Sequence, residues 1–350
     1  MSDQPASDHP SPARPRAARR VLAITGGSSG IGRCAAVLFA RKGWDVGLIA
    51  RGEPGLEAAL SDVRQTGARG CYAVADVASP AALEAAAAEI EAKLGPIDAW
   101  VNCAGVSVYG RFMDITEEEY NRVTAVTYLG QVHGTRVALR RMLPRNHGNI
   151  VNVGSAVALR AVPLQVPYSA AKYAVAGFTE AVRAELLHED SAVQIGIVHP
   201  PSTNTPFFNH ALSKLADGVP RPPPPVYQPE IVAEAIHLAV TTGRREVKVG
   251  GQTVAFGLAN TLMPGALDWA TGKFGPGMQV SHSEGVRAER DENLFEPSSR
   301  PSPVHGAFSS EALRHSPQMA LNHVPGLGMM VLGLGALGLL AALLGPPRHR

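Results

Sequence analysis

Short apolar runs alternate with amphipathic segments along most of the chain, beginning at Val21. The apolar runs lack polar alternation and predict strands at 21–25, 45–50, 71–76, 97–102, 149–154, 193–199 and 246–250. The segments between them predict helices at 30–42, 80–94, 117–142, 167–187 and 230–242, and a further helix that follows the second strand and ends near residue 65. Strands of this kind separated by helices are typical of a parallel sheet that is covered on both faces. The pattern therefore predicts a doubly wound α/β Rossmann-type domain over residues 21–255.

Outside this domain the pattern weakens. Residues 1–20 are rich in Pro, Ser and Arg and lack an apolar core, so they predict a disordered tail and no signal peptide. Residues 256–295 retain some helical periodicity and predict a helical extension. Residues 296–325 are rich in Pro, Ser and His, which predicts a linker.

The segment 326–345 has no charge and no hydrogen-bonding side chain over twenty residues. As a helix it would be about 30 Å long, which matches the hydrocarbon core of a bilayer. A buried helix in an oligomer interface is the alternative, but the preceding linker favours an independent element. We predict a single-pass C-terminal membrane anchor, of open orientation, with the catalytic domain in the cytoplasm.

Composition and charge narrow the chemistry. The 350 residues carry 32 Lys and Arg against 30 Asp and Glu, a net charge of +2 that argues against nucleic-acid binding. Cys34, Cys71 and Cys103 show no CxxC spacing, and the histidines form no ligand cluster. The sequence therefore favours a reducing compartment and chemistry without a metal.

A glycine-rich turn, TGGSSGIG at 25–32, joins the first strand to the first helix. Glycine lets a phosphate-bearing ligand approach the backbone closely, and the helix N-terminus offers free N–H groups and a partial positive charge. Glycine also serves packing in such turns, but its place after the first strand of a βα series favours dinucleotide binding. The residues predicted to contact the dinucleotide here are Gly26, Ser28, Ser29, Gly30, Ile31 and Gly32.

The end of the second strand carries a signal for the cofactor. An acidic residue there accepts hydrogen bonds from a ribose 2′-hydroxyl, whereas an Arg pairs with a 2′-phosphate. The strand ends at Arg51 with no acidic residue before Glu53. Arg51 therefore favours NADP over NAD, the alternative being a solvated surface Arg.

Three side chains predict proton chemistry: Ser155 after the fifth strand, and Tyr168 and Lys172 one helical turn apart. A lysine ammonium near a phenol favours the phenolate and lowers its pKa. Tyr168 is then a candidate general acid for carbonyl reduction or base for alcohol oxidation. Ser155 can donate a hydrogen bond to the substrate oxygen.

Over residues 20–250 the chain resembles the short-chain dehydrogenase/reductase family. The resemblance rests on TGxxxGxG at 25–32, Asp76–Val77, the NxAG motif at 102–105, Ser155, and YxxxK at 168–172. It implies a seven-stranded Rossmann sheet, hydride transfer with NAD(P), Tyr168 as proton donor and a homo-oligomer. Lys172 would bind the nicotinamide ribose and lower the tyrosine pKa, and Ser155 would orient the substrate oxygen. The further cofactor contacts that it implies are Asp76 and Val77 at the adenine, Asn102, Ala104 and Gly105, and Thr205 at the nicotinamide amide.

Two positions depart from the family pattern. Thr127 stands where the family often has an Asn that supports a water-linked proton path, and Pro200-Pro201 replaces the usual Pro-Gly. A threonine hydroxyl can hold such a water, or the relay runs differently.

The substrate region is apolar. In the segment that follows Pro200, Phe207, Phe208 and Leu212 either line a pocket or dock a lid onto the core. Five side chains after Ser155 contain no carboxylate or ammonium group and favour a lipophilic substrate: Val157, Ala158, Leu159, Val162 and Leu164. The sequence thus predicts an NADP-dependent oxidoreductase acting on a small lipophilic carbonyl or alcohol. The alternatives are a non-catalytic dinucleotide-binding regulator and an enzyme of the same fold that catalyses epimerisation or dehydration.

Overall fold

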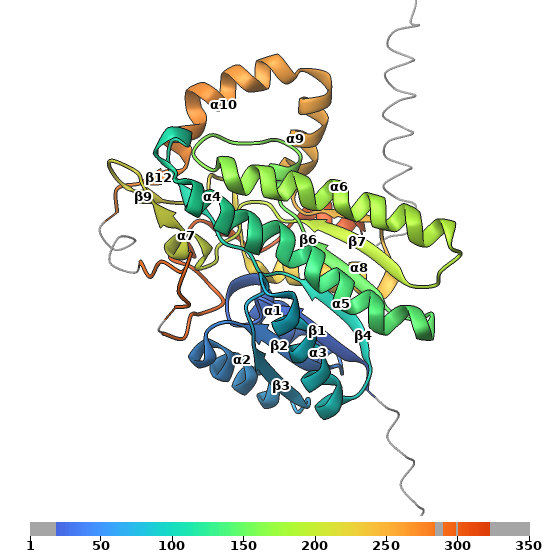
Figure 1. Ribbon diagram of the computed structural model, residues 1–350. Coiled ribbons are helices and arrows are strands. Elements are labelled where there is room, and N and C mark those ends of the chain that lie inside the picture. The colour runs from blue at the N-terminus through green and yellow to red at the C-terminus, as the bar shows by residue number, and fades with distance from the viewer. Residues whose placement is uncertain (1–18, 284–289, 299, 323–350) are drawn as a thin grey trace, which may run out of the picture.

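A seven-stranded parallel sheet forms the centre of the molecule in a computed structural model that describes residues 19–283, 290–298 and 300–322 (Figure 1). The strand order is β11-β7-β6-β4-β1-β2-β3. The strands are β1 (Val21–Thr25), β2 (Asp45–Ala50), β3 (Gly70–Val74), β4 (Ile97–Asn102), β6 (Asn149–Val153), β7 (Gln194–His199) and β11 (Glu246–Lys248). The predicted Rossmann sheet is confirmed. The order reverses between β1 and β4, where open α/β sheets bind ligands.

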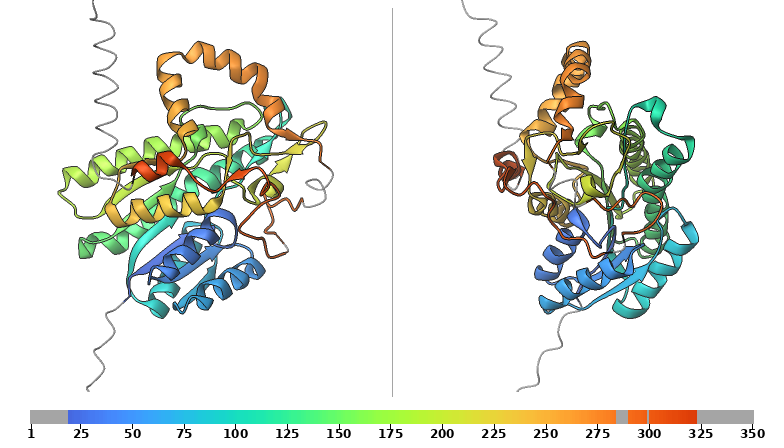
Figure 2. Two further views of the ribbon diagram at one scale, coloured as in Figure 1. Left: turned by 180° about the vertical axis from the view of Figure 1, so that it is seen from behind. Right: turned by 90° about the vertical axis from the view of Figure 1, so that its left-hand side faces the viewer.

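Helices cover both faces of this sheet, as the front view in Figure 1 and the rear view in Figure 2 show. One layer holds α1 (Gly30–Arg41), α2 (Glu53–Gln65) and α8 (Pro229–Thr242), and the other holds α3 (Pro80–Leu94), α5 (Gly130–Met142) and α6 (Val166–His188). Within β1, Leu22 and Ile24 pack in the first apolar layer while Val21 and Ala23 pack in the second. Residues 21–24 are therefore apolar without interruption because both faces of β1 are buried.

The single helix predicted over 117–142 is interrupted. It consists of α4 (Glu117–Thr124), a π-helical turn (Ala125–Leu129) and α5. The buried Thr127 lies in the π turn, where its hydroxyl donates to the Val106 carbonyl (2.9 Å) and accepts from the Val106 amide (3.0 Å). The π turn thus joins this helix to the loop after β4, and such turns often occur at functional sites.

The segment after β7 packs over the carboxyl ends of the strands. It contains α7 (Phe207–His210) and the short strands β8 (Leu212–Ser213), β9 (Val219–Pro220) and β10 (Val226–Tyr227). β8 pairs with β5 (Val108–Tyr109), and β9 pairs with β12 (Val280–Ser281).

Two helices, α9 (Gly251–Leu262) and α10 (Pro264–Met278), follow β11 and stand away from the sheet (Figure 1). We call them the α9–α10 hairpin. They account for part of the helical extension predicted over 256–295.

The structure differs from the prediction of a linker over 296–325. The described residues 290–298 and 300–308, here named the strap, run back across the domain, with Leu294 and Phe308 buried (Figure 2). β13 (Ala312–Leu313) then pairs with β10, and α12 (Pro317–Asn322) buries Met319. Pro and Ser made the segment look like a linker, but its widely spaced apolar residues anchor an irregular backbone that has no period to detect.

Two predictions concern residues outside the described ranges. Of the predicted disordered tail at 1–20, the structure describes Arg19 and Arg20, and the segment 326–345 lies beyond the last described residue. Within the described ranges, no helix is both long and apolar enough to cross a membrane. The C-terminal anchor therefore stays a prediction.

Candidate active site

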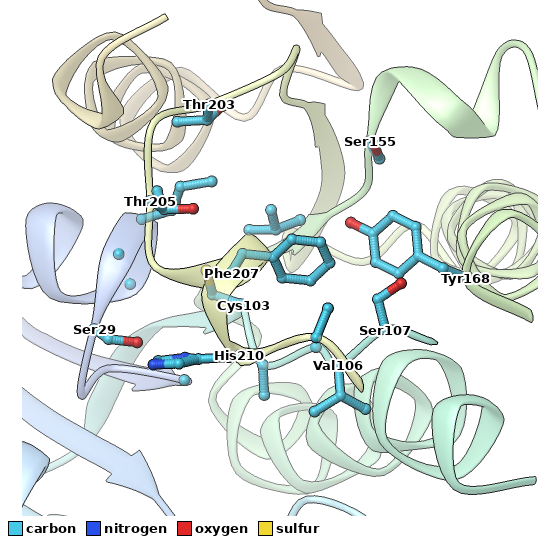
Figure 3. A pocket seen from close by; sticks show the side chains of 18 of the residues that line it. Ser29, Cys103, Val106, Ser107, Ser155, Tyr168, Thr203, Thr205, Phe207 and His210 are labelled. Atoms are coloured by element: carbon cyan, nitrogen blue, oxygen red, sulfur yellow. The ribbon is translucent and has the colours of Figure 1, made fainter. Parts of the chain in front are cut away.

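A deep cavity lies at the carboxyl ends of β1, β4, β6 and β7, lined by the glycine-rich turn at one end and by Tyr168 and α7 at the other. Figure 3 shows the Tyr168 ring facing Phe207, with Ser155 and Ser107 on either side of it. The sequence motifs that lie far apart in the chain thus meet in one cavity.

The glycine-rich turn has the backbone that the sequence predicts. Gly26 (φ +68°) and Gly30 (φ +49°) adopt left-handed conformations that favour glycine. A Cβ on Gly32 would lie 2.1 Å from the Gly26 carbonyl oxygen, so no side chain fits there. All six predicted residues of the turn line the cavity beside the N-terminus of α1. The geometry fits the phosphates of a dinucleotide.

Ser155, Tyr168 and Lys172 also lie together. Ser155 follows β6 and its hydroxyl hydrogen-bonds Tyr168, while the Val157 amide donates to the same hydroxyl oxygen (3.2 Å). Lys172 Nζ lies 5.5 Å from the centre of the Tyr168 ring and donates to the Val153 carbonyl (2.7 Å). The predicted Ser, Tyr and Lys constellation is therefore assembled at one point of the cavity.

The pKa values differ from the simple expectation. Burial raises the pKa of Tyr168 above its usual value and outweighs the opposing hydrogen bond from Ser155. Burial lowers the pKa of Lys172 to about 8. The predicted lowering of the tyrosine pKa by Lys172 is not found, because the ammonium is turned toward the Val153 carbonyl. A protonated phenol in this position suits a proton donor.

His199 positions the Ser155 backbone and was missed from the sequence. Its Nδ1 lies 3.0 Å from the Ser155 carbonyl oxygen, and its Nε2 lies 3.3 Å from Glu246 Oε1. The hydrogen bond with His199 lowers the pKa of the Glu246 carboxyl. A lone histidine at the end of a strand gave no signal, because its partner Glu246 lies on another strand.

Asn102 does not line the cavity, in contrast to its prediction as a cofactor contact. Its Oδ1 accepts from Trp100 Nε1 (2.7 Å), and its Nδ2 donates to Asn152 Oδ1 (2.8 Å) and Thr135 Oγ1 (3.1 Å). The side chain is fully buried between β4, α5 and β6. The Asn102 side chain therefore stabilises the end of β4 from within the core. Ala104 and Gly105, after it, do line the cavity.

Thr25 holds the same loop from the other side and was also missed. Its hydroxyl accepts from the amides of Cys103 (3.0 Å) and Ala104 (3.3 Å). Burial raises the pKa of the Cys103 thiol to about 12, which suits a packing residue rather than a nucleophile.

The far end of the cavity carries Asp76, Val77 and Arg51. Burial raises the pKa of Asp76, but hydrogen bonds from the Ala78 amide (2.9 Å) and Arg122 (2.6 Å) outweigh it and hold the pKa below its usual range. Thr205, the predicted nicotinamide contact, also lines the cavity and lies beside Gly30.

Arg51 lies at this end with its guanidinium bonded to the strap. It donates to the carbonyls of Phe295 (2.7 Å) and Asn293. Burial and the nearby charge of Arg122 lower its pKa, and an arginine still stays charged. Its hydrogen-bond partners are neutral carbonyls, while the charges of the Asp76 and Glu296 carboxylates partly offset this lowering of its pKa.

The strap supplies a wall of the cavity. The Gly30 amide donates to the Pro303 carbonyl (3.2 Å), and Arg33 donates to the Ser302 carbonyl (3.0 Å). The strap residues that line the cavity are Asn293, Pro297, Ser298, Arg300 and Ser302. Sequence reasoning missed them because no motif or periodicity marks them.

The substrate end of the cavity is largely apolar. Phe207 lies 5.2 Å from Tyr168 between ring centres, and Phe207 and Phe208 line the cavity, whereas Leu212 packs against the core. Val157 and Val162 line it, while Ala158, Leu159 and Leu164 do not. Phe208 also packs on Tyr109 and Phe308, so it serves both of the roles considered for it.

Two hydroxyl groups interrupt the apolar lining. Ser107 Oγ and Tyr109 Oη are buried and have no hydrogen-bond partner within the described residues. Both residues line the cavity, and the Tyr109 hydroxyl is close enough to Tyr168 for the two to influence each other's titration. Buried hydroxyls without partners are rare and costly, so they mark places where a ligand can bond.

Comparisons with known proteins identify the family of the chain. A profile of short chain dehydrogenases matches residues 20–216. The uncharacterized oxidoreductase YxnA of Bacillus subtilis is 34% identical over 280 residues, covering 80% of this chain and 77% of that protein. The chain therefore belongs to the short-chain dehydrogenase family and is an NAD(P)-dependent oxidoreductase.

Other similarities cover a smaller part of the related protein or have a lower sequence identity. The 3-ketodihydrosphingosine reductase of Bos taurus is 32% identical over 192 residues, which are 53% of this chain and 57% of that enzyme. The structure of an actinorhodin polyketide ketoreductase with NADPH is 27% identical, with a TM-score of 0.59 over 67% of this chain and 97% of that one. A short chain dehydrogenase from Burkholderia phymatum in complex with NAD has a TM-score of 0.64 over 69% and 93%, at 24% identity.

Proposed function

We propose that this protein is an NADP-dependent reductase or dehydrogenase that interconverts a lipophilic carbonyl compound and its alcohol. The observation that carries the proposal is the position of Tyr168, which is hydrogen-bonded to Ser155 and faces the Phe207 ring in the cavity that the glycine-rich turn also lines. NADPH, when bound, supplies the hydride. The alcohol oxidation runs the same steps in reverse.

The residues of the chain have separate roles in the reduction. Ser155 accepts from the Val157 amide and keeps its hydroxyl proton to donate in a hydrogen bond to the substrate oxygen. Tyr168 Oη transfers its proton to that oxygen as negative charge develops there. Lys172, one helical turn away and with a pKa of about 8, is a source from which Tyr168 can regain a proton.

The preference for NADP rests on charge at the far end of the cavity. Arg51 lies there, bonded to neutral carbonyls and in no ion pair with a carboxylate of the described residues, and Asp76, the nearby carboxylate, is paired with Arg122 (2.6 Å). A 2′-phosphate adds negative charge next to Arg51, whereas a bare ribose gains nothing from it.

The substrate carries a second polar group near the reacting carbonyl. Ser107 and Tyr109 line the cavity and offer buried hydroxyls that have no partner within the described residues. A hydroxyl, amine or second carbonyl group of the substrate would satisfy them, and the remainder of the substrate would contact Phe207, Phe208 and Val162. The sequence similarity to the 3-ketodihydrosphingosine reductase of Bos taurus is compatible with such a substrate.

Two further features of the proposal concern the setting of the enzyme. The segment 326–345 anchors the protein in a membrane, with the catalytic domain on the cytoplasmic side. The protein acts as a homo-oligomer, as its family suggests.

The experiment that tests the function follows NADPH consumption by the full-length protein against ketones of increasing chain length. We expect kcat/KM to rise with chain length and to be higher for NADPH than for NADH. Tyr168→Phe should lower kcat by about 100-fold or more. Tyr173→Phe is the matched control, because Tyr173 lies on the same helix but is exposed.

Three results would contradict the proposal. They are failure to bind either dinucleotide, a preference for NADH, or turnover that does not depend on Tyr168.

A further inference from the structure

The α9–α10 hairpin is apolar but buries almost none of its side chains. Residues 251–278 contain two charged side chains, Asp268 and Lys273. Yet Thr253 is the buried residue of α9, and Gly275 that of α10. A helix of a soluble domain normally turns its apolar stripe toward the core. The exposed apolar surface of these two helices therefore indicates an interaction with a surface outside the domain.

Large apolar side chains form that surface. Leu258, Leu262 and Trp269 are 60%, 68% and 63% exposed. They are joined by Val254, Phe256, Met263, Phe274 and Met278. Figures 1 and 2 show the two helices projecting from the domain on the side opposite to α2 and α3.

The carboxylate of the hairpin is paired, and its lysine lies beside a tryptophan. Arg160 bonds Asp268 Oδ1 (2.6 Å) and Asn260 Oδ1 (3.1 Å), which neutralises the carboxylate and holds the hairpin to the loop after Ser155. Lys273 lies over the Trp269 ring at 5.7 Å from its centre. A tryptophan beside a lysine at the edge of an apolar surface is typical of segments at a bilayer interface.

The surface continues into the active-site cavity. Phe256 and Gln252 of α9 and Arg160 all line that cavity. An apolar molecule that leaves the α9–α10 surface therefore reaches the Tyr168 end of the cavity along α9.

The chain leaves the described structure next to this hairpin. Gln318 of α12 accepts from the amide of Gly250, which caps α9 (2.9 Å), and donates to the Lys248 carbonyl (2.8 Å). The Asn322 carbonyl is held by Arg244 (2.5 Å). The charge-free residues 326–345 follow Asn322 after three intervening residues.

We propose that the α9–α10 hairpin lies in the interface of a lipid bilayer and that the active-site cavity opens there to take its substrate from the lipid phase. The inference deepens the proposed function, because it names the source of the lipophilic substrate. The exposed apolar side chains enter the acyl-chain boundary, and Lys273 remains at the headgroups.

Trp269 provides a direct test that needs no turnover. The other tryptophans, Trp44 and Trp100, are buried in the domain. The full-length protein is reconstituted in phosphatidylcholine vesicles whose acyl chains carry bromine, and tryptophan emission is compared with that in unlabelled vesicles. We expect bromine to quench a component of the wild-type emission that is missing from Trp269→Phe.

A second set of variants tests the surface as a whole. Leu258→Gln/Leu262→Gln should reduce the quenching of Trp269, because each buried apolar side chain contributes about tenfold to partition. The same variant should raise KM for a long-chain ketone carried in vesicles and leave turnover of a soluble short-chain ketone unchanged. Val74→Gln/Leu187→Gln, at exposed apolar sites elsewhere, is the matched control.

Several outcomes would overturn the inference. Equal quenching of wild type and Trp269→Phe would place the hairpin away from the lipid, and so would failure to associate with vesicles. A blue-shifted Trp269 emission without lipid that depends on protein concentration would show that a second copy covers the surface. The activity of all variants on the soluble short-chain ketone reports separately on the proposed function.

Discussion

Lys172 is a buried amine, and replacing it with methionine tests the electrostatics of the site. The side chain is 3% exposed, and its pKa lies at about 8 against 10.5 for an exposed lysine. The native state therefore binds fewer protons than the unfolded state between pH 8 and 10.5. Stability consequently rises with pH across this window, and below pH 8 the buried charge costs stability.

The size of the effect follows from the two pKa values. A difference between 10.5 and about 8 corresponds to about 3 kcal/mol, because one pH unit is worth about 1.4 kcal/mol. Lys172→Met removes this titration and leaves the other groups in place. The free energy of unfolding of the wild type, relative to that of the variant, should therefore increase by about 3 kcal/mol from pH 7 to pH 10.5.

The assay is urea unfolding of both proteins at a series of pH values, with Lys42→Met as the control for an exposed lysine. Packing differences and the hydrogen bond to the Val153 carbonyl shift the two curves by an amount that depends little on pH. A difference between wild type and Lys172→Met that stays flat from pH 7 to pH 10.5 would refute the reasoning. A difference that falls with pH would also refute it, because the sign would be wrong.

Three further predictions concern the support of the site and its specificity. Asn102→Ala should lower the free energy of unfolding by about 3 kcal/mol in urea titrations, because Trp100 Nε1 loses its buried acceptor. Unchanged stability together with weaker NADPH binding would instead indicate that Asn102 contacts the cofactor. Arg51→Gln should weaken NADPH binding about tenfold or more in fluorescence titrations and leave NADH binding nearly unchanged. An equal loss of affinity for both dinucleotides would show that Arg51 does not bind the 2′-phosphate. Tyr109→Phe should lower kcat/KM about tenfold for ketones with a second polar group and leave kcat/KM for simple ketones unchanged. An equal effect on both kinds of ketone would contradict a contact between the Tyr109 hydroxyl and that second group.

The sequence predicted the elements whose residues carry a period or a motif. The strands at 21–25, 45–50 and 97–102 match β1, β2 and β4, because burial on both faces leaves an uninterrupted apolar run. The glycine-rich turn was predictable because its backbone excludes a Cβ at Gly32. Ser155, Tyr168 and Lys172 were found because a family motif marks them, and the structure brings them together.

The parts that sequence reasoning missed depend on contacts between distant residues. The strap carries no period, and its place is fixed by single contacts such as that of Arg33 with the Ser302 carbonyl. Asn102 looked like a cofactor contact because it belongs to the NxAG motif, whose Ala104 and Gly105 line the cavity, but its side chain points into the network with Trp100 and Asn152. The raised pKa of Tyr168 depends on burial and on the direction of the Lys172 side chain, which spacing along a helix does not define.

The central claim is that Tyr168 supports transfer of hydride from NADPH to a substrate carbonyl. The most direct measurement supplies NADPH deuterated at the transferred position of nicotinamide C4 and follows the product of a ketone by mass spectrometry. The account predicts one deuterium on the carbinol carbon of the wild-type product and almost no product from Tyr168→Phe under the same conditions. Product formed without deuterium would indicate epimerisation or dehydration chemistry, and equal labelled product from Tyr168→Phe would contradict the role of the tyrosine.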